Sequence, residues 1–263
     1  MRTTLSTLHK RAAEGSKIVA LTCYDASFAK LLEAAGVDIL LVGDSLGMVL
    51  QGHESTLPVT MQQMLYHVES VARGSTQAFI VADMPFGSYQ DEPQAAFRNA
   101  SQLLRAGAHM VKLEGGQVLL ETTRFLVDRG IPVFSHLGLT PQAVHQLGGY
   151  RVQGKHEDDA RQLQQDALDL AAAGASLMLL ECIPASLARA VTAAISIPTI
   201  GIGAGPDCSG QVLVLYDLLG IYGGKTPKFA KNFMVDAADI HHAVAQYVSD
   251  VKAQRFPGTE HVF

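Results

Sequence analysis

The sequence is poor in cysteine, and the cysteines that it has are isolated. Cys23, Cys182 and Cys208 are odd in number, lie far apart and form no CxxC pair. Isolated thiols are typical of a reducing compartment, and the lack of a CxxC pair argues against a structural zinc site. We therefore expect a cytoplasmic protein whose thiols are packing residues rather than nucleophiles.

The sequence also lacks clustered basic residues and long apolar runs. The formal net charge of −5 argues against a surface that binds nucleic acid or an anionic membrane. No apolar run approaches the roughly 20 residues that a membrane-spanning helix needs. Residues 1–5 lead into no apolar segment with a cleavage site, so we expect no signal peptide.

No linker rich in Pro, Gly or Ser divides the chain, and 263 residues are typical of one (β/α)8 barrel. Short apolar runs alternate with segments of helical periodicity, as expected for parallel strands joined by helices. We therefore predict an α/β protein, a single (βα)8 TIM barrel that spans residues 1–263. The predicted strands are residues 18–21, 39–42, 79–82, 110–113, 132–135, 177–180, 199–202 and 212–215.

Signals for helix starts stand between these runs. Asp25 and the pair Thr60 and Gln63 are typical N-terminal caps, and a further helix is predicted to open at Asp91. We expect the tail after Gln254 to be loose. The other predicted helices are residues 118–129, 158–173, 185–194 and 237–251.

A short repeat supports the barrel. Gly36, Gly107 and Gly174 each follow an alanine and each come just before a predicted strand. The spacing from this glycine to the acid at the strand end is equal in the second and third copies and one residue longer in the first. Equivalent turns that lead into equivalent strands are what a βα array predicts.

Charged side chains stand at the ends of four apolar runs. These residues are Asp44, Asp83, the pair Lys112 and Glu114, and Glu181. A hydrophobic core has no need of such charges. Because the carboxyl ends of barrel strands meet at one face, where active sites form, we predict one active site built from several strand ends.

Asp44 and Asp83 have no Lys or Arg beside them in the sequence. Two carboxylates at neighbouring strand ends suit a hard cation that keeps several water ligands, and Mg²⁺ is the default. The alternative is that each carboxylate caps the helix that follows. We favour the metal, because a long loop rather than a helix is expected after Asp44.

Lys112 and Glu114 alternate with apolar residues, so both side chains point to one face of their strand, into the barrel near its mouth. One interpretation is a buried ion pair between barrel layers. The other places Lys112 on a substrate carboxylate and Glu114 toward the metal, directly or through water. Lys112 could instead form a Schiff base, as some aldolases do.

Glu181 and His136 end two further strands. Apolar neighbours would raise the proton affinity of Glu181, which suits a general base that removes a proton next to a carbonyl; the alternative is a helix cap. His136 is equally compatible with a core residue and with a ligand. The long loops 43–59 and 137–155 are candidate covers, and the glycines of residues 201–205 favour close backbone packing against substrate over a phosphate cradle.

These residues lie in short motifs along nearly the whole chain. The motifs are TCYD at 22–25, VGDSLG at 42–47, QGH at 51–53, STLPVT at 55–60, ADMPF at 82–86, VKLEGG at 111–116, HLGLTPQ at 136–142, LEC at 180–182, IGIGAG at 200–205 and PKFAK at 227–231. Jointly they are highly specific, and the chain resembles the ketopantoate hydroxymethyltransferase family of pantothenate biosynthesis. In one departure, Ser209 stands where the family often has an acid, which leaves the role of that loop open.

The resemblance implies a barrel of the phosphoenolpyruvate mutase/isocitrate lyase type and a homo-oligomer, commonly a decamer. It implies transfer of a hydroxymethyl group from 5,10-methylenetetrahydrofolate to the 2-oxo acid 3-methyl-2-oxobutanoate, giving 2-dehydropantoate. One Mg²⁺ per subunit would stabilise the enolate of the keto acid, and the folate would be a co-substrate. No nucleic acid and no membrane would take part.

The resemblance also implies roles for individual residues. Asp44 and Asp83 would hold Mg²⁺, and Glu114 would complete its shell. The substrate-binding residues would be Asp44, Ser45, Asp83 and Lys112. Glu181 would be the proton acceptor.

Three alternatives stay open at this point. The first is a Mg²⁺-dependent carbon–carbon lyase or aldolase that acts on a 2-oxo acid, although the chain has no Lys-Lys-Cys-Gly loop of the isocitrate lyase kind. The second is a Schiff-base aldolase that uses Lys112. The third is a barrel without activity that only binds a keto acid or serves as a scaffold, and the ionisable groups at the strand ends argue against it.

Overall fold

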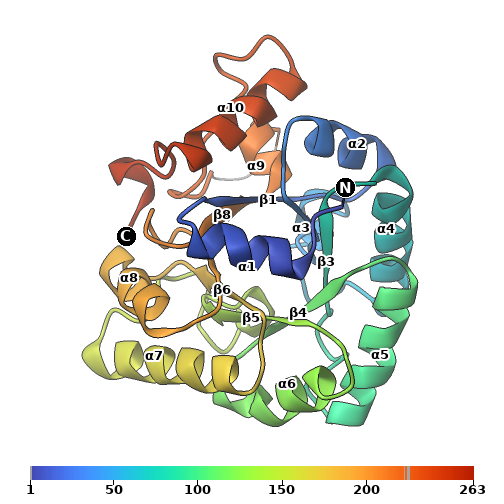
Figure 1. Ribbon diagram of the computed structural model, residues 1–263, viewed down its shortest axis with the longest axis vertical. Helices are drawn as coiled ribbons and strands as arrows, with labels where there is room; N and C mark the ends of the chain where they lie inside the picture. The colour runs from blue at the N-terminus through green and yellow to red at the C-terminus, as the bar shows by residue number, and fades with distance from the viewer. Residues whose placement is uncertain (1, 222, 224–225) are drawn as a thin grey trace.

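Apolar runs that end in a polar residue form the barrel. The computed structural model describes residues 2–221, 223 and 226–263, and its eight parallel strands close in chain order, with β8 beside β1 (Figure 1). Side chains buried on both faces explain why these strands are almost wholly apolar. The strands are β1 (Ile18–Thr22), β2 (Ile39–Val42), β3 (Phe79–Asp83), β4 (Met110–Glu114), β5 (Val133–Gly138), β6 (Leu177–Glu181), β7 (Thr199–Ile202) and β8 (Gly210–Leu213). The predicted barrel is confirmed.

Helices surround the strands on the outside of the barrel (Figure 1). They are α1 (Leu5–Ala13), α2 (Ala26–Ala34), α3 (Leu46–Val49), α4 (Met61–Gly74), α5 (Pro93–Arg105), α6 (Leu120–Val127), α7 (Glu157–Ala172), α8 (Ala185–Ala194), α9 (Leu215–Leu219) and α10 (Ile240–Lys252). Short 3₁₀ turns lie at Gln117–Leu119, Pro141–Ala143 and Thr259–His261. No helix in the described part of the chain is long and apolar enough to cross a membrane.

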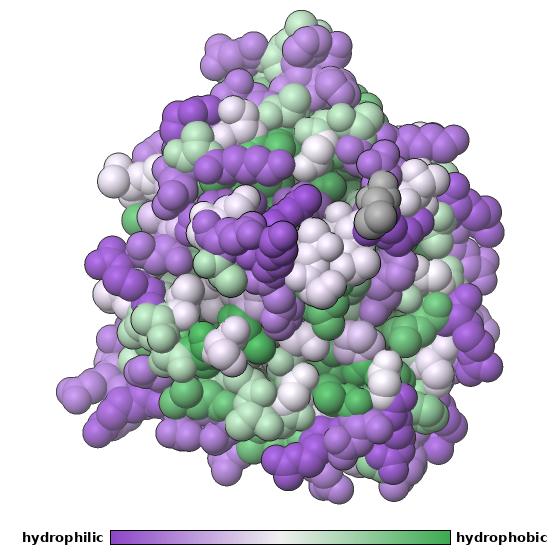
Figure 2. All heavy atoms as spheres, in the orientation of Figure 1, coloured by the Kyte–Doolittle hydropathy of each residue, from purple (hydrophilic) through white to green (hydrophobic). Residues whose placement is uncertain are grey.

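Helix α1 was not predicted, and it lies across the barrel end opposite the strand carboxyl ends. Its Leu8 is fully buried, and the imidazole of His9 contacts the carbonyl of Ser176, just before β6. Hydrophilic side chains gather over α1 on its outer side (Figure 2). One buried residue in nine is too weak a pattern to predict this helix from periodicity.

The predicted caps of α2 and α4 are confirmed. The Asp25 side chain accepts hydrogen bonds from the backbone N–H groups of Ser27 and Phe28, and Thr60 forms a reciprocal capping box with Gln63. The predicted start of α5 at Asp91 is wrong. The helix begins at Pro93, whose fixed φ and missing N–H suit the first helical turn.

The glycines of the repeat make equivalent turns, as predicted. Gly36, Gly107 and Gly174 have φ values of +95°, +115° and +101°. A residue with a side chain is strained at such angles, so glycine is required where each helix turns back into the next strand. These turns set the strands in register and bring their charged ends to one face.

The C-terminal region differs from the prediction. The last strand ends at Leu213, because the next residues leave the barrel and form α9. The tail after Gln254 is not loose: the Phe256 ring is 3% exposed and lies 5.6 Å and 5.7 Å from the ring centres of Phe233 and Tyr247. These edge-to-face contacts fix the tail on α10.

Glu33 fixes the turn that leads into β3 and was not foreseen from the sequence. Its carboxylate accepts hydrogen bonds from the backbone N–H groups of Thr76, Gln77 and Ala78 and from two hydroxyls. Burial would raise the pKa of Glu33, but these donors outweigh it and lower the pKa to about 2. The depressed pKa means that the ionised carboxylate stabilises the folded state.

We predict that Glu33→Gln lowers the free energy of unfolding by about 1–2 kcal/mol at pH 7, a value limited by the partial exposure of the side chain. Because the pKa falls from 4.5 to about 2 on folding, the wild-type advantage is complete above pH 4.5 and declines as the pH falls toward 2. Urea unfolding at pH 7, 5 and 3.5 measures this trend. An equal difference at all three pH values would contradict it.

Candidate active site

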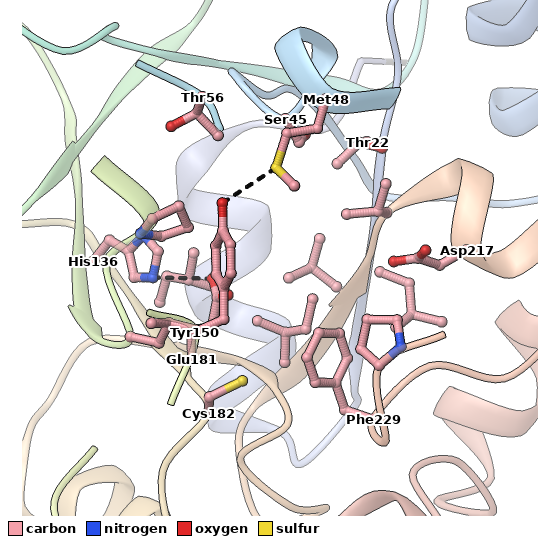
Figure 3. Close-up of a pocket in the computed structure, with 18 of the residues that line it drawn as sticks. Thr22, Ser45, Met48, Thr56, His136, Tyr150, Glu181, Cys182, Asp217 and Phe229 are labelled. Carbon is pink, nitrogen blue, oxygen red and sulfur yellow. Dashed lines mark hydrogen bonds and ion pairs between the residues drawn. The ribbon is translucent and has the colours of Figure 1, made fainter. Parts of the chain in front are cut away.

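The strand carboxyl ends surround a cavity of about 670 Å³. Every predicted site residue lies in its wall: Asp44, Ser45, Asp83, Lys112, Glu114, His136 and Glu181. Residues from β2 through β6 thus meet at one site, although they are up to 137 positions apart in the sequence (181 − 44). Figure 3 shows His136, Glu181, Ser45 and Asp217 around this cavity. The predicted convergence of several strand ends on one cavity is confirmed, and the roles of the individual residues stay predictions.

Lys112 is the cation at the centre of the site. Its ammonium nitrogen lies 3.3 Å from Asp83 Oδ1 and 3.1 Å from Glu114 Oε1, and its side chain is 3% exposed. Burial would lower the pKa of Lys112, but the surrounding carboxylates raise it well above its usual value. Lys112 is therefore a permanent positive charge, which disfavours the neutral amine that a Schiff base needs.

Asp44 and Asp83 face each other at the ends of β2 and β3. The backbone N–H of Asp44 donates to Asp83 Oδ2 at 3.0 Å. Burial and the neighbouring carboxylates raise the pKa of both side chains, Asp44 more strongly. The expectation of a loop without a helix after Asp44 is wrong, because the short helix α3 begins at Leu46. Neither carboxylate caps a helix, however, because Ser45 and Glu92 stand at the N-caps of α3 and α5.

Gln142 holds the orientation of Asp44 and was missed as a site residue. Its side-chain amide donates to Asp44 Oδ2 at 2.8 Å and to the Met84 carbonyl at 2.9 Å. Its side-chain oxygen accepts a hydrogen bond from the Tyr89 hydroxyl at 2.6 Å. A neutral residue in a loop gives no charge signal, and only its place in the HLGLTPQ motif could have pointed to it.

Glu114 is fully engaged by the protein. Its Oε1 pairs with Lys112, and its Oε2 accepts a hydrogen bond from the backbone N–H of Gln142 at 3.0 Å. Burial would raise the pKa of Glu114, but Lys112 and His136 lower it to about 2. A carboxylate with both oxygens occupied is better placed to reach a metal through water than directly.

His136 joins Glu114 to Glu181. Its Nδ1 lies 3.4 Å from Glu114 Oε1, and its Nε2 lies 3.2 Å from Glu181 Oε2, the contact drawn in Figure 3. Burial and Lys112 oppose a charge on His136, but the two carboxylates raise its pKa to about 9. His136 Nδ1 also lies 3.3 Å from the Lys112 ammonium, so the imidazole contacts charged groups of both neighbouring strands, β4 and β6, and is part of the site rather than a core residue.

Glu181 ends β6, and its side chain is 15% exposed to the cavity. It does not cap the following helix: Pro184 is the N-cap of α8, and no side chain bonds to that helix start. The carboxylate thus faces a cavity in which an acceptor for a substrate proton could act. The alternative of a helix cap is wrong.

The two long loops predicted as covers meet over the cavity. The Tyr150 hydroxyl lies 3.4 Å from the sulfur of Met48, which belongs to the short helix α3 in the first loop (Figure 3). Met48, Tyr150, Arg151 and Val152 all line the cavity. The two loops are thus in contact with each other, and their role as covers stays a prediction.

The glycines after β7 serve packing within the protein. A Cβ on Gly203 would lie 3.0 Å from the Phe229 ring, and one on Gly205 would lie 2.7 Å from the side chain of Ala185. The expected packing against substrate stays a prediction. Ser209 exchanges hydrogen bonds with Thr199 at the amino ends of β7 and β8, away from the cavity.

The cysteines behave as packing residues. Cys23, Cys182 and Cys208 are buried, and burial raises the pKa of Cys23 to about 12 and that of Cys208 to about 11. Burial also raises the pKa of Cys182, which lines the cavity. None of the three is a thiolate at neutral pH, so none is an activated nucleophile.

The acidic residues of the cavity suit a metal ion whose remaining ligands are water and substrate oxygens. Within residues 2–221, 223 and 226–263, no three His, Cys, Asp or Glu side chains are arranged to enclose a metal ion by themselves. Asp83 Oδ1 is buried without a hydrogen bond, and its pKa and that of Asp44 are raised because negative charge is in excess. Mg²⁺ held by two carboxylates, with water and substrate oxygens as further ligands, meets these conditions.

Comparison with known proteins gives one family. The family model described as ketopantoate hydroxymethyltransferase matches residues 2–259. The 3-methyl-2-oxobutanoate hydroxymethyltransferase of Aromatoleum aromaticum is 63% identical over 99% of this chain and 96% of its own length. That of Chromobacterium violaceum is 62% identical over the full length of both chains.

Solved structures show the same fold at low identity. A 2,3-dimethylmalate lyase, described as a PEP mutase/isocitrate lyase superfamily member, has a TM-score of 0.60 and 16% identity over 98% of this chain and 100% of its own. A phosphonopyruvate hydrolase in complex with oxalate and Mg²⁺ has a TM-score of 0.62 and 13% identity over 97% of both chains. The predicted barrel type is thus confirmed.

We predict that Asp44→Asn changes the stability of the protein in opposite directions with and without a divalent metal ion. Without divalent ions, the substitution removes one of two repelling buried carboxylates and raises the free energy of unfolding by about 1–2 kcal/mol. With millimolar Mg²⁺, the wild type gains stability by binding the ion, and the variant gains little. Thermal unfolding with EDTA and with Mg²⁺ measures both effects.

Asp207→Asn is the matched control, because Asp207 pairs with Arg189 outside the cavity. This variant should respond to Mg²⁺ as the wild type does. An Asp44→Asn protein that is stabilised by Mg²⁺ as much as the wild type would remove Asp44 from the metal site.

Proposed function

The chain belongs to the ketopantoate hydroxymethyltransferase family, and from this premise we propose that it transfers a hydroxymethyl group from 5,10-methylenetetrahydrofolate to 3-methyl-2-oxobutanoate. The product is 2-dehydropantoate. The observation that carries the proposal is the convergence of two repelling carboxylates, one permanent cation and the strand-end carboxylate of Glu181 on one cavity. Each of these groups has a task in the chemistry of a 2-oxo acid.

Binding of the keto acid is assigned to Lys112 and Ser45. The buried ammonium of Lys112 attracts a substrate carboxylate, and its charge is permanent because the neighbouring carboxylates raise its pKa. The Ser45 hydroxyl is held by that of Tyr24 at 3.0 Å and lines the same cavity. Together they give one end of the substrate a fixed orientation.

Asp44 and Asp83 would hold the one Mg²⁺ of the subunit, with Glu114 contributing through water. When bound, Mg²⁺ supplies Lewis-acid stabilisation of the negative charge that develops on the carbonyl oxygen of the keto acid. The protein itself keeps the carboxylates in place: Gln142 orients Asp44, and the backbone of Asp44 orients Asp83.

Glu181 is assigned the proton transfer. Its carboxylate takes the proton from C3 of the keto acid, next to the carbonyl, and leaves an enolate. His136 Nε2 lies 3.2 Å from Glu181 Oε2 and helps to hold that carboxylate at the cavity. In the transfer, the two C–N bonds of the folate methylene unit break and are replaced by a bond to C3 and a bond to the oxygen of water. Tetrahydrofolate leaves with two N–H groups, which carry the proton removed from C3 and one proton of the water.

The size of the cavity supports two substrates. A five-carbon keto acid fills on the order of 200 Å³, if each heavy atom takes up no more room than a water molecule. The cavity has a volume of about 670 Å³, so most of it is left for part of a second ligand, such as the ring system of the folate. A lyase that acts on one small 2-oxo acid needs no such space.

Two further expectations belong to the proposal. The homodecamer and the cytoplasmic location follow from the resemblance and from the free thiols and stay predictions. Analytical ultracentrifugation would measure the oligomeric state, and a mass far from ten subunits would correct it.

We predict that Glu181→Gln abolishes exchange of the C3 proton. With 3-methyl-2-oxobutanoate and Mg²⁺ in D₂O and without folate, the wild type should show metal-dependent loss of the C3 proton signal in the NMR spectrum. The variant should be slower by at least about 10³-fold, because no base remains at the strand end. Its binding of the keto acid should change little, because Lys112 and the carboxylate pair are intact.

Glu121→Gln is the matched control, since Glu121 lies exposed on α6. Full exchange in the Glu181→Gln protein would remove Glu181 from this role. Reduction with borohydride in the presence of the keto acid tests the Schiff-base alternative: a stable adduct on Lys112 would favour an aldolase.

A further inference from the structure

The proposed chemistry leaves one buried carboxylate of the cavity unused. Asp217 lies in α9, lines the cavity and is 8% exposed. Its side chain forms no hydrogen bond and no ion pair with any residue that the structure describes. A buried carboxylate without a partner destabilises the folded protein unless a ligand supplies the missing donors.

The described residues around Asp217 do not explain why an ionised carboxylate is buried at this place. Burial alone raises its pKa to about 6, so the group is still mostly ionised at neutral pH. Lys228, in the same wall, donates to the carbonyl of Val262 and lies 5.0 Å from the centre of the Phe263 ring. An acid in the first turn of a helix is favourable, but α9 has five residues and this role does not require burial.

Asp217 lies apart from the proton-transfer residues. In Figure 3 its carboxylate points into the cavity from the side opposite His136 and Glu181, and the Phe229 ring projects into the space near it. Val214, three positions before Asp217, and Pro227, two positions before Phe229, also line the cavity. This wall thus combines one charged acceptor with an aromatic ring and apolar side chains, which suits a planar ring that carries N–H donors.

We propose that Asp217 accepts two parallel N–H donors from the pyrimidine edge of the reduced pterin of the folate co-substrate. The inference rests on the proposed function, which requires a folate and leaves its binding residues open. The 2-amino group and the ring N–H of a pterin are adjacent donors, and a carboxylate matches such a pair with two hydrogen bonds. The keto acid is excluded as the ligand here, because a carboxylate repels another anion.

The test is a comparison of Asp217→Asn with the wild type. The amide has the same shape but accepts only one hydrogen bond and turns an N–H group toward the pterin. We expect the KM for 5,10-methylenetetrahydrofolate to rise at least about 30-fold, which is the loss of one charge-assisted hydrogen bond. The KM for 3-methyl-2-oxobutanoate and the folate-independent C3 exchange should stay within about twofold.

A second arm identifies the part of the folate that is recognised. Tetrahydropterin and its 2-oxo analogue, a tetrahydrolumazine, are added as competitors of the transfer reaction. The wild type should favour the pterin, and Asp217→Asn should lose or reverse this preference, because its amide can donate to the 2-oxo group. p-Aminobenzoylglutamate, which has no pterin, should inhibit both proteins equally.

The outcomes separate the inference from the proposed function. A wild type that transfers the one-carbon unit while Asp217→Asn keeps its KM for the folate would overturn only the role of Asp217. Loss of C3 exchange in a variant whose Tm is at least that of the wild type would place Asp217 at the keto acid and also overturn the inference. A wild type that exchanges the C3 proton but neither binds nor uses the folate would overturn both the inference about Asp217 and the proposed function.

The Tm of the Asp217→Asn variant shows whether a loss of function results from unfolding or from the missing contact with the folate. Replacing an unpartnered buried carboxylate by an amide should leave the Tm at neutral pH equal to or above that of the wild type. Asp207→Asn again serves as the control, with unchanged KM values for both substrates. A variant of lower Tm is compared through its C3 exchange, which reports whether the remainder of the site is intact.

Discussion

The excess of negative charge around one buried lysine is the constraint on which the site depends. Lys112 is the central cation between Asp83 and Glu114, with Asp44 nearby, and all of these side chains are buried. One ammonium cannot neutralise three carboxylates, and burial makes the remaining charge costly. The raised pKa of Asp44 and of Asp83 expresses that cost, and a divalent cation together with an anionic substrate would relieve it.

The barrel and its loops hold this unfavourable arrangement in place. The backbone N–H of Asp44 fixes Asp83, Gln142 fixes Asp44, and the Tyr89 hydroxyl fixes Gln142. His136 connects the same charges to Glu181 on the next strand. The cluster is therefore one unit, joined by hydrogen bonds and ion pairs, in which metal, substrate and base positions are set together rather than residue by residue.

Asp217 shows the same principle on the other side of the cavity. Among the residues that the structure describes, this buried carboxylate has no hydrogen-bond or ion-pair partner, and it lies at a place where a ligand can supply one. The two sides differ in what they attract: the β2–β4 side favours a cation with an anionic ligand, and the α9 side favours a neutral ring with N–H donors. Such a division suits an enzyme that brings two unlike substrates into one cavity.

The sequence by itself determined the barrel, the ends of most strands and the charged residues of the site, because apolar runs that end in Asp44, Asp83 or Glu181 are local patterns. It could not show Glu33, Gln142 or Asp217 in their roles. A carboxylate or amide acquires its role from donors that are far away in the chain: Gln142 is 98 positions from Asp44. Only the closed barrel brings such groups within hydrogen-bond distance. Burial removes the water that would otherwise donate hydrogen bonds to Asp217, so a ligand has to supply these donors.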